Sequence, residues 1–128
     1  MQRNVDIGVI GENIASIFLE KRGFKIIARN YRKKWGEIDI VAQKSNVYRF
    51  IEVKSVSCET GIDRVTRETI RPEDNMHRYK FSKLLKTIET YLLEKGIDSE
   101  WQLDLVTVRI DRNKREAIAE IFENIIFD

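Results

Sequence analysis

The chain has 128 residues, of which 42% are hydrophobic and 34% charged, and its formal net charge is only +2. This composition is typical of a single folded domain, here residues 1–128, and excludes a disordered chain. A lone cysteine, Cys58, and a lone histidine, His77, exclude a disulfide framework, a cysteine-based zinc site and a histidine-dependent triad. No segment resembles a membrane span or a signal peptide, so we expect a cytoplasmic protein with no membrane partner.

The first predicted element is a helix over residues 5–22, followed by Gly23, a common helix terminator. Its apolar positions recur at helical spacing: Ile7, Ile10, Ile14, Ile17 and Phe18. Gly8, Gly11 and Ala15 form a second stripe of small residues. Because glycine weakens a helix, this stripe indicates close approach of another backbone.

Three strands are predicted next, over residues 24–30, 36–42 and 47–53, with a basic, aromatic connection over residues 31–35. The last two strands flank Lys44-Ser45-Asn46, which is typical of a hairpin turn. They are therefore expected to pair in an antiparallel hairpin.

A long loop over residues 57–75 leads to a second predicted helix, residues 76–95, and to a strand over residues 101–110. Residues 116–122 favour an edge strand, with a short helix as the alternative. The order α-β-β-β-α-β-β predicts an α/β fold with a mixed central sheet flanked by two helices. The second helix supplies the crossover to the strand that follows it.

Two acidic side chains are predicted to meet on one face of the hairpin. A two-residue turn places Asp39 opposite Glu52 and Glu37 opposite Lys54. Opposed side chains lie ~5 Å apart, so two carboxylates there require a proton or a cation between them. Mg²⁺, with Mn²⁺ as the alternative, suits such oxygen ligands, and Lys54 lies on the same face. The competing interpretation is an exposed cross-strand ion pair.

Glu12 lies on the small-residue stripe that we expect to face the sheet. A carboxylate there needs a partner, which a metal ion or the Lys54 ammonium could supply. The alternative is a solvated helix charge. Glu37 is expected to be an ion-pair partner, or a residue that supports the metal ligands, rather than a metal ligand itself.

Basic and aromatic residues alternate in the connection after the first strand: Arg29, Tyr31, Arg32, Lys33, Lys34 and Trp35. This pattern favours phosphate contact with base stacking, and a solvated turn is the alternative. Arg64, Arg67 and Arg71 in the long loop could clamp a nucleic-acid backbone. Lys80 and Lys83 lie near the start of the second helix, where positive charge is mildly unfavourable, which favours phosphate binding. His77 is expected to be a surface residue.

Several motifs occur together in this order: Gly8-x-x-Gly11-Glu12-x-x-Ala15, Gly23-Phe24, Arg29-Asn30-Tyr31-Arg32, Gly36-Glu37-Ile38-Asp39, Phe50-Ile51-Glu52-Val53-Lys54, Lys80, Tyr91-Leu92 and Leu103-Asp104-Leu105-Val106. Asp39 followed by Glu52-Val53-Lys54 resembles the signature of PD-(D/E)xK nucleases. Nearly the whole chain is similar to the bacterial YraN-like family, described as distantly related to archaeal Holliday junction resolvases.

This resemblance implies a restriction-endonuclease-like fold and a Mg²⁺-dependent endonuclease. Asp39 and Glu52 would then be metal ligands, Lys54 the catalytic lysine and Glu12 an accessory acid at the metal. DNA, branched or damaged, is the expected substrate, and a homodimer would provide two sites for cutting two strands. Two other hypotheses stay open: a nucleic-acid-binding module that does not cut, and an interaction protein that binds a repair or recombination partner.

Overall fold

Two helices and five strands follow one another in the expected order in the computed structural model, which describes residues 6–58 and 78–125. The elements are α1 (Ile7–Lys21), β1 (Lys25–Lys33), β2 (Gly36–Lys44), β3 (Val47–Ser57), α2 (Arg78–Lys95), β4 (Trp101–Asp111) and β5 (Glu116–Phe122). The predicted α/β order is therefore confirmed, including the strand at residues 116–122. Neither of the helices described is long and apolar enough to cross a membrane.

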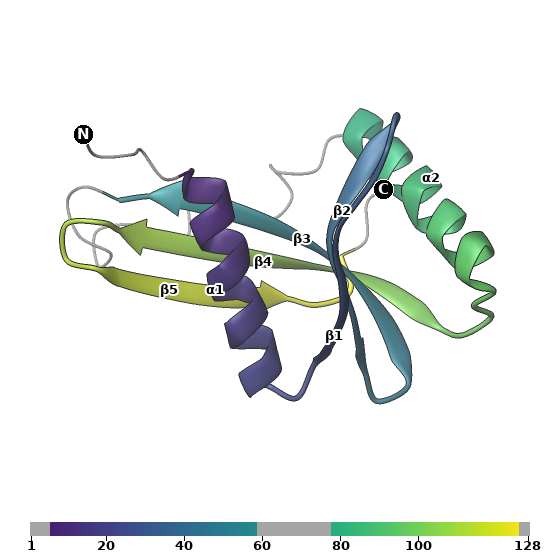
Figure 1. The fold of residues 1–128 in the computed structure, drawn as a ribbon, viewed down its shortest axis with the longest axis horizontal. Coiled ribbons are helices and arrows are strands. Elements are labelled where there is room, and N and C mark those ends of the chain that lie inside the picture. The colour runs from purple at the N-terminus through teal and green to yellow at the C-terminus, as the bar shows by residue number, and fades with distance from the viewer. Residues whose placement is uncertain (1–5, 59–77, 126–128) are drawn as a thin grey trace.

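The sheet is mixed, with the strand order β1-β2-β3-β4-β5. β3 and β4 run parallel, and the other neighbouring pairs are antiparallel. The crossover between the parallel strands contains α2, as predicted. Figure 1 shows α1 lying across β3, β4 and β5, whereas α2 lies beside the β1–β2 hairpin at the other end of the sheet. The two helices thus cover different parts of the sheet.

The alternation of side chains along the central strands gives each helix its own core. Ile51 packs with Leu19 of α1, whereas the preceding residue, Phe50, packs with Ile88 and Tyr91 of α2. Neighbouring strand residues point to opposite faces, so both faces of β3 are buried. This explains why consecutive residues in the middle of β3, Phe50 and Ile51, are both apolar.

α1 approaches β3 closely because of one glycine. A Cβ built on Gly11 would lie 1.7 Å from Oγ of Ser55, so no larger residue fits without a shift of the helix. Ala15 is fully buried, but Gly8 is exposed, and a Cβ there would meet only its own N-cap residue, Asp6. The close approach predicted for the small-residue stripe therefore holds at Gly11 and Ala15 and is wrong at Gly8.

The hairpin between β2 and β3 turns at Ser45 and Asn46, with φ angles of 54° and 64°. Two consecutive left-handed residues make the tight turn whose twist matches that of the flanking strands. Pairing begins at Lys44 and Val47, which is the register that the sequence predicts.

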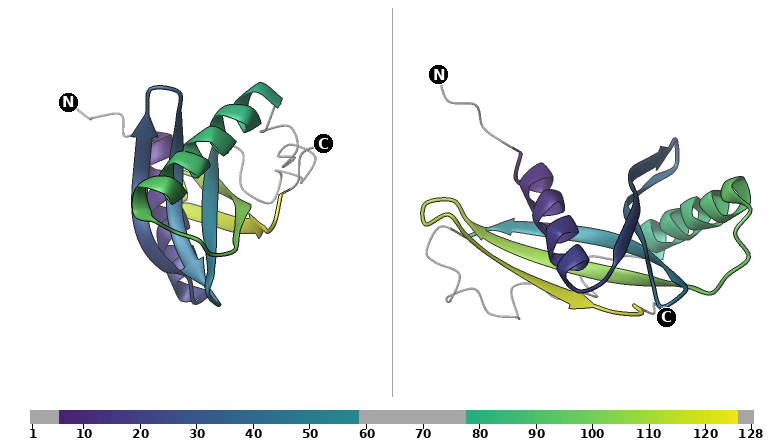
Figure 2. Two further views of the ribbon diagram at one scale, coloured as in Figure 1. Left: turned by 90° about the vertical axis from the view of Figure 1, so that its right-hand side faces the viewer. Right: turned by 60° about the horizontal axis from the view of Figure 1, so that its bottom comes forward.

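The expected connection over residues 31–35 is wrong. β1 continues through Tyr31 and Arg32 to Lys33, which pairs with Gly36, so the turn comprises Lys34 and Trp35. These residues remain in the strand because they have antiparallel partners on β2. Figure 2 shows the tip of this hairpin rising away from β3–β5 beside α2. Most of the predicted loop at residues 57–75, including Arg64, Arg67 and Arg71, lies outside the described residues. His77, at the start of the second predicted helix, also lies outside them.

Candidate functional site

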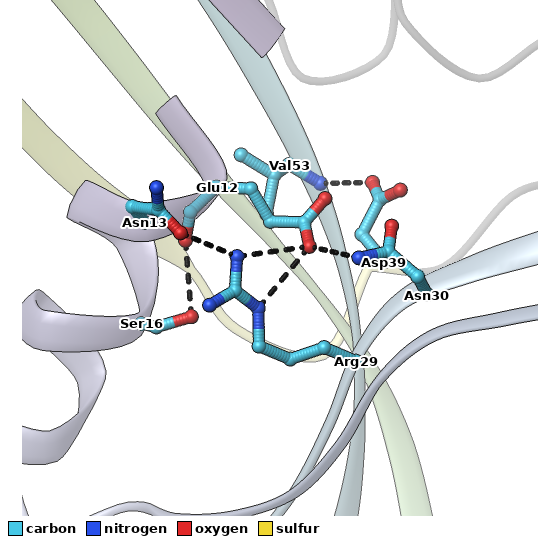
Figure 3. Close-up of polar contacts among 7 residues, drawn as sticks. All are labelled: Glu12, Asn13, Ser16, Arg29, Asn30, Asp39 and Val53. Atoms are coloured by element: carbon cyan, nitrogen blue, oxygen red, sulfur yellow. Dashed lines mark hydrogen bonds and ion pairs between the residues drawn. The ribbon is translucent and has the colours of Figure 1, made fainter. Parts of the chain in front are cut away.

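Asp39 and Glu52 lie where β2 and β3 separate. The backbone pairing of these strands runs from Lys44 and Val47 to Ile40 and Ile51, and the next positions in this register are Asp39 and Glu52. The backbone N–H of Val53 donates to Oδ2 of Asp39 at 2.8 Å (Figure 3). The Asp39 carboxylate thus accepts a backbone hydrogen bond from β3 at the point where β2 and β3 separate, which we call the fork. We call Asp39 and Glu52 the acid pair.

The surroundings of Asp39 raise the pKa of its carboxyl group. Burial, and after it the negative charge of Glu52, raises the pKa of Asp39 to about 8, although the hydrogen bond from Val53 acts in the opposite direction. Glu37 raises this pKa as well, through a hydrogen bond and through its charge. Burial and like charge both disfavour the ionised form of a carboxyl group. When no cation is bound beside it, Asp39 therefore retains its proton at neutral pH in most molecules.

Two lysines, Lys54 and Lys80, line the same hollow as the acid pair. Nζ of Lys80, on α2, lies 2.7 Å from Oε1 of Glu52. Lys54 is exposed on β3 and lines the same hollow as both acids. Glu37 forms an ion pair with Arg32 at 2.7 Å, so its predicted role as an ion-pair partner is confirmed.

The acid pair borders two open hollows. The α1-side hollow, of about 520 Å³, is lined by Glu12, Lys54 and Ser55 together with the acid pair and Lys80. The α2-side hollow, of about 310 Å³, is lined by Trp35, Lys83 and Leu84, again with the acid pair and Lys80. The acid pair and Lys80 therefore lie where the two hollows meet, accessible from both.

Glu12 faces the α1-side hollow but has partners of its own. Its Oε1 accepts hydrogen bonds from Nε of Arg29 at 3.2 Å and from Nδ2 of Asn30 at 2.7 Å (Figure 3). Arg29 is fixed further by a 2.7 Å hydrogen bond to Asn13. The Glu12 side chain is only 12% exposed, so the interpretation as a solvated helix charge is wrong. Its role as a metal ligand stays a prediction.

Some basic and aromatic residues of the β1–β2 hairpin form ion pairs and hydrogen bonds with α2, whereas others are exposed charges. Lys33 pairs with Glu94 of α2 at 2.8 Å, and the Tyr31 hydroxyl hydrogen-bonds the same carboxylate. Arg32 is 69% exposed beside the α1-side hollow, and Lys34 is exposed in the turn. Of this predicted basic segment, Arg32 is thus placed close to the acid pair, whereas Tyr31 and Lys33 join β1 to α2.

One buried ionic cluster was missed by the sequence reasoning. Arg49 and Asp104 form an ion pair of 3.1 Å between β3 and β4, with the Asp104 side chain fully buried. Asp104 also accepts hydrogen bonds from Gln102 at 2.8 Å and from the backbone N–H of Asn124 at 2.9 Å. The available signal was a charged residue within each of two apolar strands. These contacts tie the chain after β5 to the sheet.

The acid pair is compatible with a divalent ion. Among residues 6–58 and 78–125, no group of three or more Asp, Glu, His or Cys side chains is arranged to hold a metal. Two carboxylates beside an open hollow still suit Mg²⁺, which commonly takes one or two carboxylates and completes its shell with water and phosphate oxygens. Asp39 and Glu52 are the residues that could hold such an ion, with the remaining ligands coming from outside the chain.

Comparison with known proteins identifies a sequence family that matches most of the chain. Residues 11–111 match the sequence model of uncharacterised protein family UPF0102. A UPF0102 protein of Campylobacter jejuni is 39% identical over 120 residues, which are 94% of this chain and 93% of the relative. UPF0102 proteins of Campylobacter fetus (37% over 115 residues, 89% and 91%) and Aliarcobacter butzleri (36% over 120 residues, 92% and 94%) are also similar. The matched region contains the acid pair, Glu12, Lys54 and Lys80.

Proposed function

The chain belongs to the UPF0102 family, and on this premise we propose that it is a metal-dependent endonuclease that hydrolyses phosphodiester bonds, with DNA as its substrate. The observation that carries the proposal is the acid pair at the fork between β2 and β3, beside two open hollows. Like charges brought together at the expense of stability are typical of functional sites. The sequence resemblance to PD-(D/E)xK nucleases points to the same chemistry.

The roles of the residues follow from their positions. Asp39 and Glu52 would hold Mg²⁺ or Mn²⁺ through their carboxylate oxygens, and Asp39 would have to be ionised to act as a ligand. The ion supplies Lewis-acid stabilisation of the phosphate and a more acidic water molecule. Lys54, exposed in the α1-side hollow, neutralises charge that develops on the scissile phosphate. Glu12, held by Arg29 and Asn30, acts as an accessory acid at the wall of that hollow.

The surroundings of the acid pair favour a phosphate-rich polymer. Arg32 and Lys80 line the α1-side hollow, and Lys80 and Lys83 line the α2-side hollow. Such basic groups on both sides of the acids can follow a nucleic-acid backbone through the fork. Branched or damaged DNA is the preferred substrate by the family resemblance, and a homodimer would supply two sites for cutting two strands.

A second function is a nucleic-acid-binding module that keeps this fold without cutting. Two observations favour it: the raised pKa of Asp39, which leaves that acid protonated at neutral pH, and the absence of a third metal-ligating acid among the residues that the structure describes. In that case the basic groups around the hollows bind the phosphates, and the acid pair has no catalytic role.

The decisive experiment is a cleavage assay on plasmid and four-way-junction DNA with Mg²⁺, Mn²⁺ or EDTA. Asp39→Asn and Lys54→Ala test the site, and Asp98→Asn and Lys114→Ala are matched controls at positions outside it. Metal-dependent cutting that both site variants lose and both controls keep supports the nuclease. Gel shifts that survive the site variants without cutting support the binding module, and absence of DNA affinity contradicts both.

A further inference from the structure

The ion pair between Lys80 and Glu52 places a positive charge beside one of the two carboxylates that would hold the proposed metal ion. Its Nζ–Oε1 distance of 2.7 Å is that of a charge-assisted hydrogen bond. We propose that Lys80 is a positioning residue that holds Glu52 in the metal-free protein and gives way to the divalent ion when that ion binds. This inference rests on the proposed function, because it assumes that the acid pair is the metal site.

The exposure of the two partners makes such an exchange feasible. The Glu52 side chain is only 13% exposed, so its charge needs a partner, whereas the Lys80 side chain is 49% exposed and belongs to the first turn of α2. A half-exposed lysine has a flexible stem, and its surface ion pair is weak. Lys80 can therefore leave Glu52 for solvent without disturbing the core.

The contrast with Arg29 strengthens this interpretation. Arg29 donates to both Glu12 and Asn13, and Asn30 donates to the same Glu12 oxygen, so this cation is fixed on its acid. Within the part of the chain that the structure describes, Lys80 has Glu52 as its one ionic partner. The protein thus gives one acid a permanent cation and the other an exchangeable cation.

The position of Lys80 gives the exchange a consequence for substrate binding. Lys80 lines both hollows beside the acid pair, so an ammonium released from Glu52 remains at the entrance to the site. A free ammonium there can contact a phosphate, which the Glu52 carboxylate otherwise prevents. Binding of the metal ion and of nucleic acid would then be positively coupled through Lys80, independently of any ligand that bridges the two.

The first test measures Mn²⁺ binding to the full chain by titration calorimetry, without nucleic acid. Lys80→Gln should bind Mn²⁺ about three- to fivefold more tightly than the unaltered protein, because the substitution removes a competing cation, and a partly exposed ion pair has about this strength. Lys80→Arg retains the charge, and its Mn²⁺ affinity should remain within about twofold of that of the unaltered protein. Lys95→Gln is the matched control, since it removes the same charge at the other end of α2.

The second test measures melting temperature. In EDTA, Lys80→Gln should melt below the unaltered protein, and saturating Mn²⁺ should remove most of that difference. Adding Lys80→Gln to a Glu52→Gln protein should leave the melting temperature in EDTA unchanged, which would show that Lys80 acts through Glu52.

The outcomes separate this inference from the proposed function. Unaltered protein that binds Mn²⁺ while Lys80→Gln binds it equally or more weakly overturns the exchange and leaves the nuclease proposal standing. An equal gain in Lys95→Gln also overturns it, because the effect would then be one of overall charge. Absence of Mn²⁺ binding in every variant contradicts the metal site itself and with it both proposals.

Discussion

The Val53 backbone N–H donates to Asp39 Oδ2 across the point where β2 and β3 cease to pair. This hydrogen bond orients the acid with one oxygen toward β3 and leaves the second oxygen for another partner. Asp39 is therefore part of the sheet's hydrogen bonding and part of the acid pair at once. Its protonation should affect both the stability of the fold and the affinity for a metal ion.

The raised pKa of Asp39 predicts how stability depends on pH without metal. Its pKa is 3.8 for the free group and about 8 in the folded protein, so between these values the folded protein holds a proton that the unfolded chain has released. The contribution of this proton is fully present below about pH 4 and is lost as the pH rises through about 8, at roughly 1.4 kcal/mol per pKa unit at most.

Urea unfolding in EDTA at several pH values checks this prediction. The free energy of unfolding should fall between about pH 4 and pH 8, and Asp39→Asn should flatten that slope. The amide that this substitution introduces keeps an oxygen that can accept from Val53, so the variant should match the unaltered protein below about pH 4 and exceed its stability at neutral and alkaline pH. A slope that Asp39→Asn does not change, or that Asp98→Asn changes equally, would contradict the assignment of the pKa to Asp39.

Metal affinity should increase with pH in the same range. Because Asp39 must lose its proton to act as a ligand, Mn²⁺ binding should release a proton below about pH 8 and should strengthen as the pH approaches that value. Calorimetry in buffers with different ionisation enthalpies measures the released proton directly. Binding that is independent of pH between neutral and alkaline conditions would show that Asp39 is not a ligand.

Gly11 predicts a selective packing defect. A methyl group at this position would lie 1.7 Å from Oγ of Ser55, so Gly11→Ala should push α1 away from β3 and destabilise the protein by about 1–3 kcal/mol. Gly8→Ala is the control, because it is exposed and meets only Asp6; there the gain in helix propensity offsets the contact, and a change within about 1 kcal/mol is expected. Urea unfolding of both variants compares them, and equal effects would contradict the packing argument.

Sequence reasoning located the acid pair because its position depends on local geometry. The two-residue turn at Ser45 and Asn46 fixes the hairpin register, and the alternation of side chains then brings Asp39 and Glu52 to the same face. The cations could not be assigned in this way. Lys80 and Arg29 reach their acids through the packing of α2 against β2 and of α1 against β1, which no local pattern determines.

Tertiary packing, which no local pattern determines, also explains why a connection was wrongly predicted at residues 31–35. Their basic and aromatic composition resembles a loop, but Arg32 and Lys33 have acidic partners on β2 and α2, and Tyr31 packs edge-on against Tyr91. These tertiary contacts stabilise a strand whose local sequence lacks a clear alternation of apolar and polar residues, although burial does alternate along β1. The polar surface around the hollows is consequently more rigid than a loop interpretation implies.

The buried pair of Arg49 and Asp104 gives the last prediction. Asp104→Ala removes the 3.1 Å partner of the buried Arg49 guanidinium, leaves it the longer 3.9 Å pair with Glu123, and frees the N–H of Asn124. It should therefore destabilise the protein by about 3–5 kcal/mol. The double variant Arg49→Met with Asp104→Leu removes both charges and should recover most of that loss. Chemical denaturation of the two proteins measures the difference. If the double variant is as unstable as Asp104→Ala, the loss comes from the contacts of Asp104 with Gln102 and Asn124, and the uncompensated charge is not its cause.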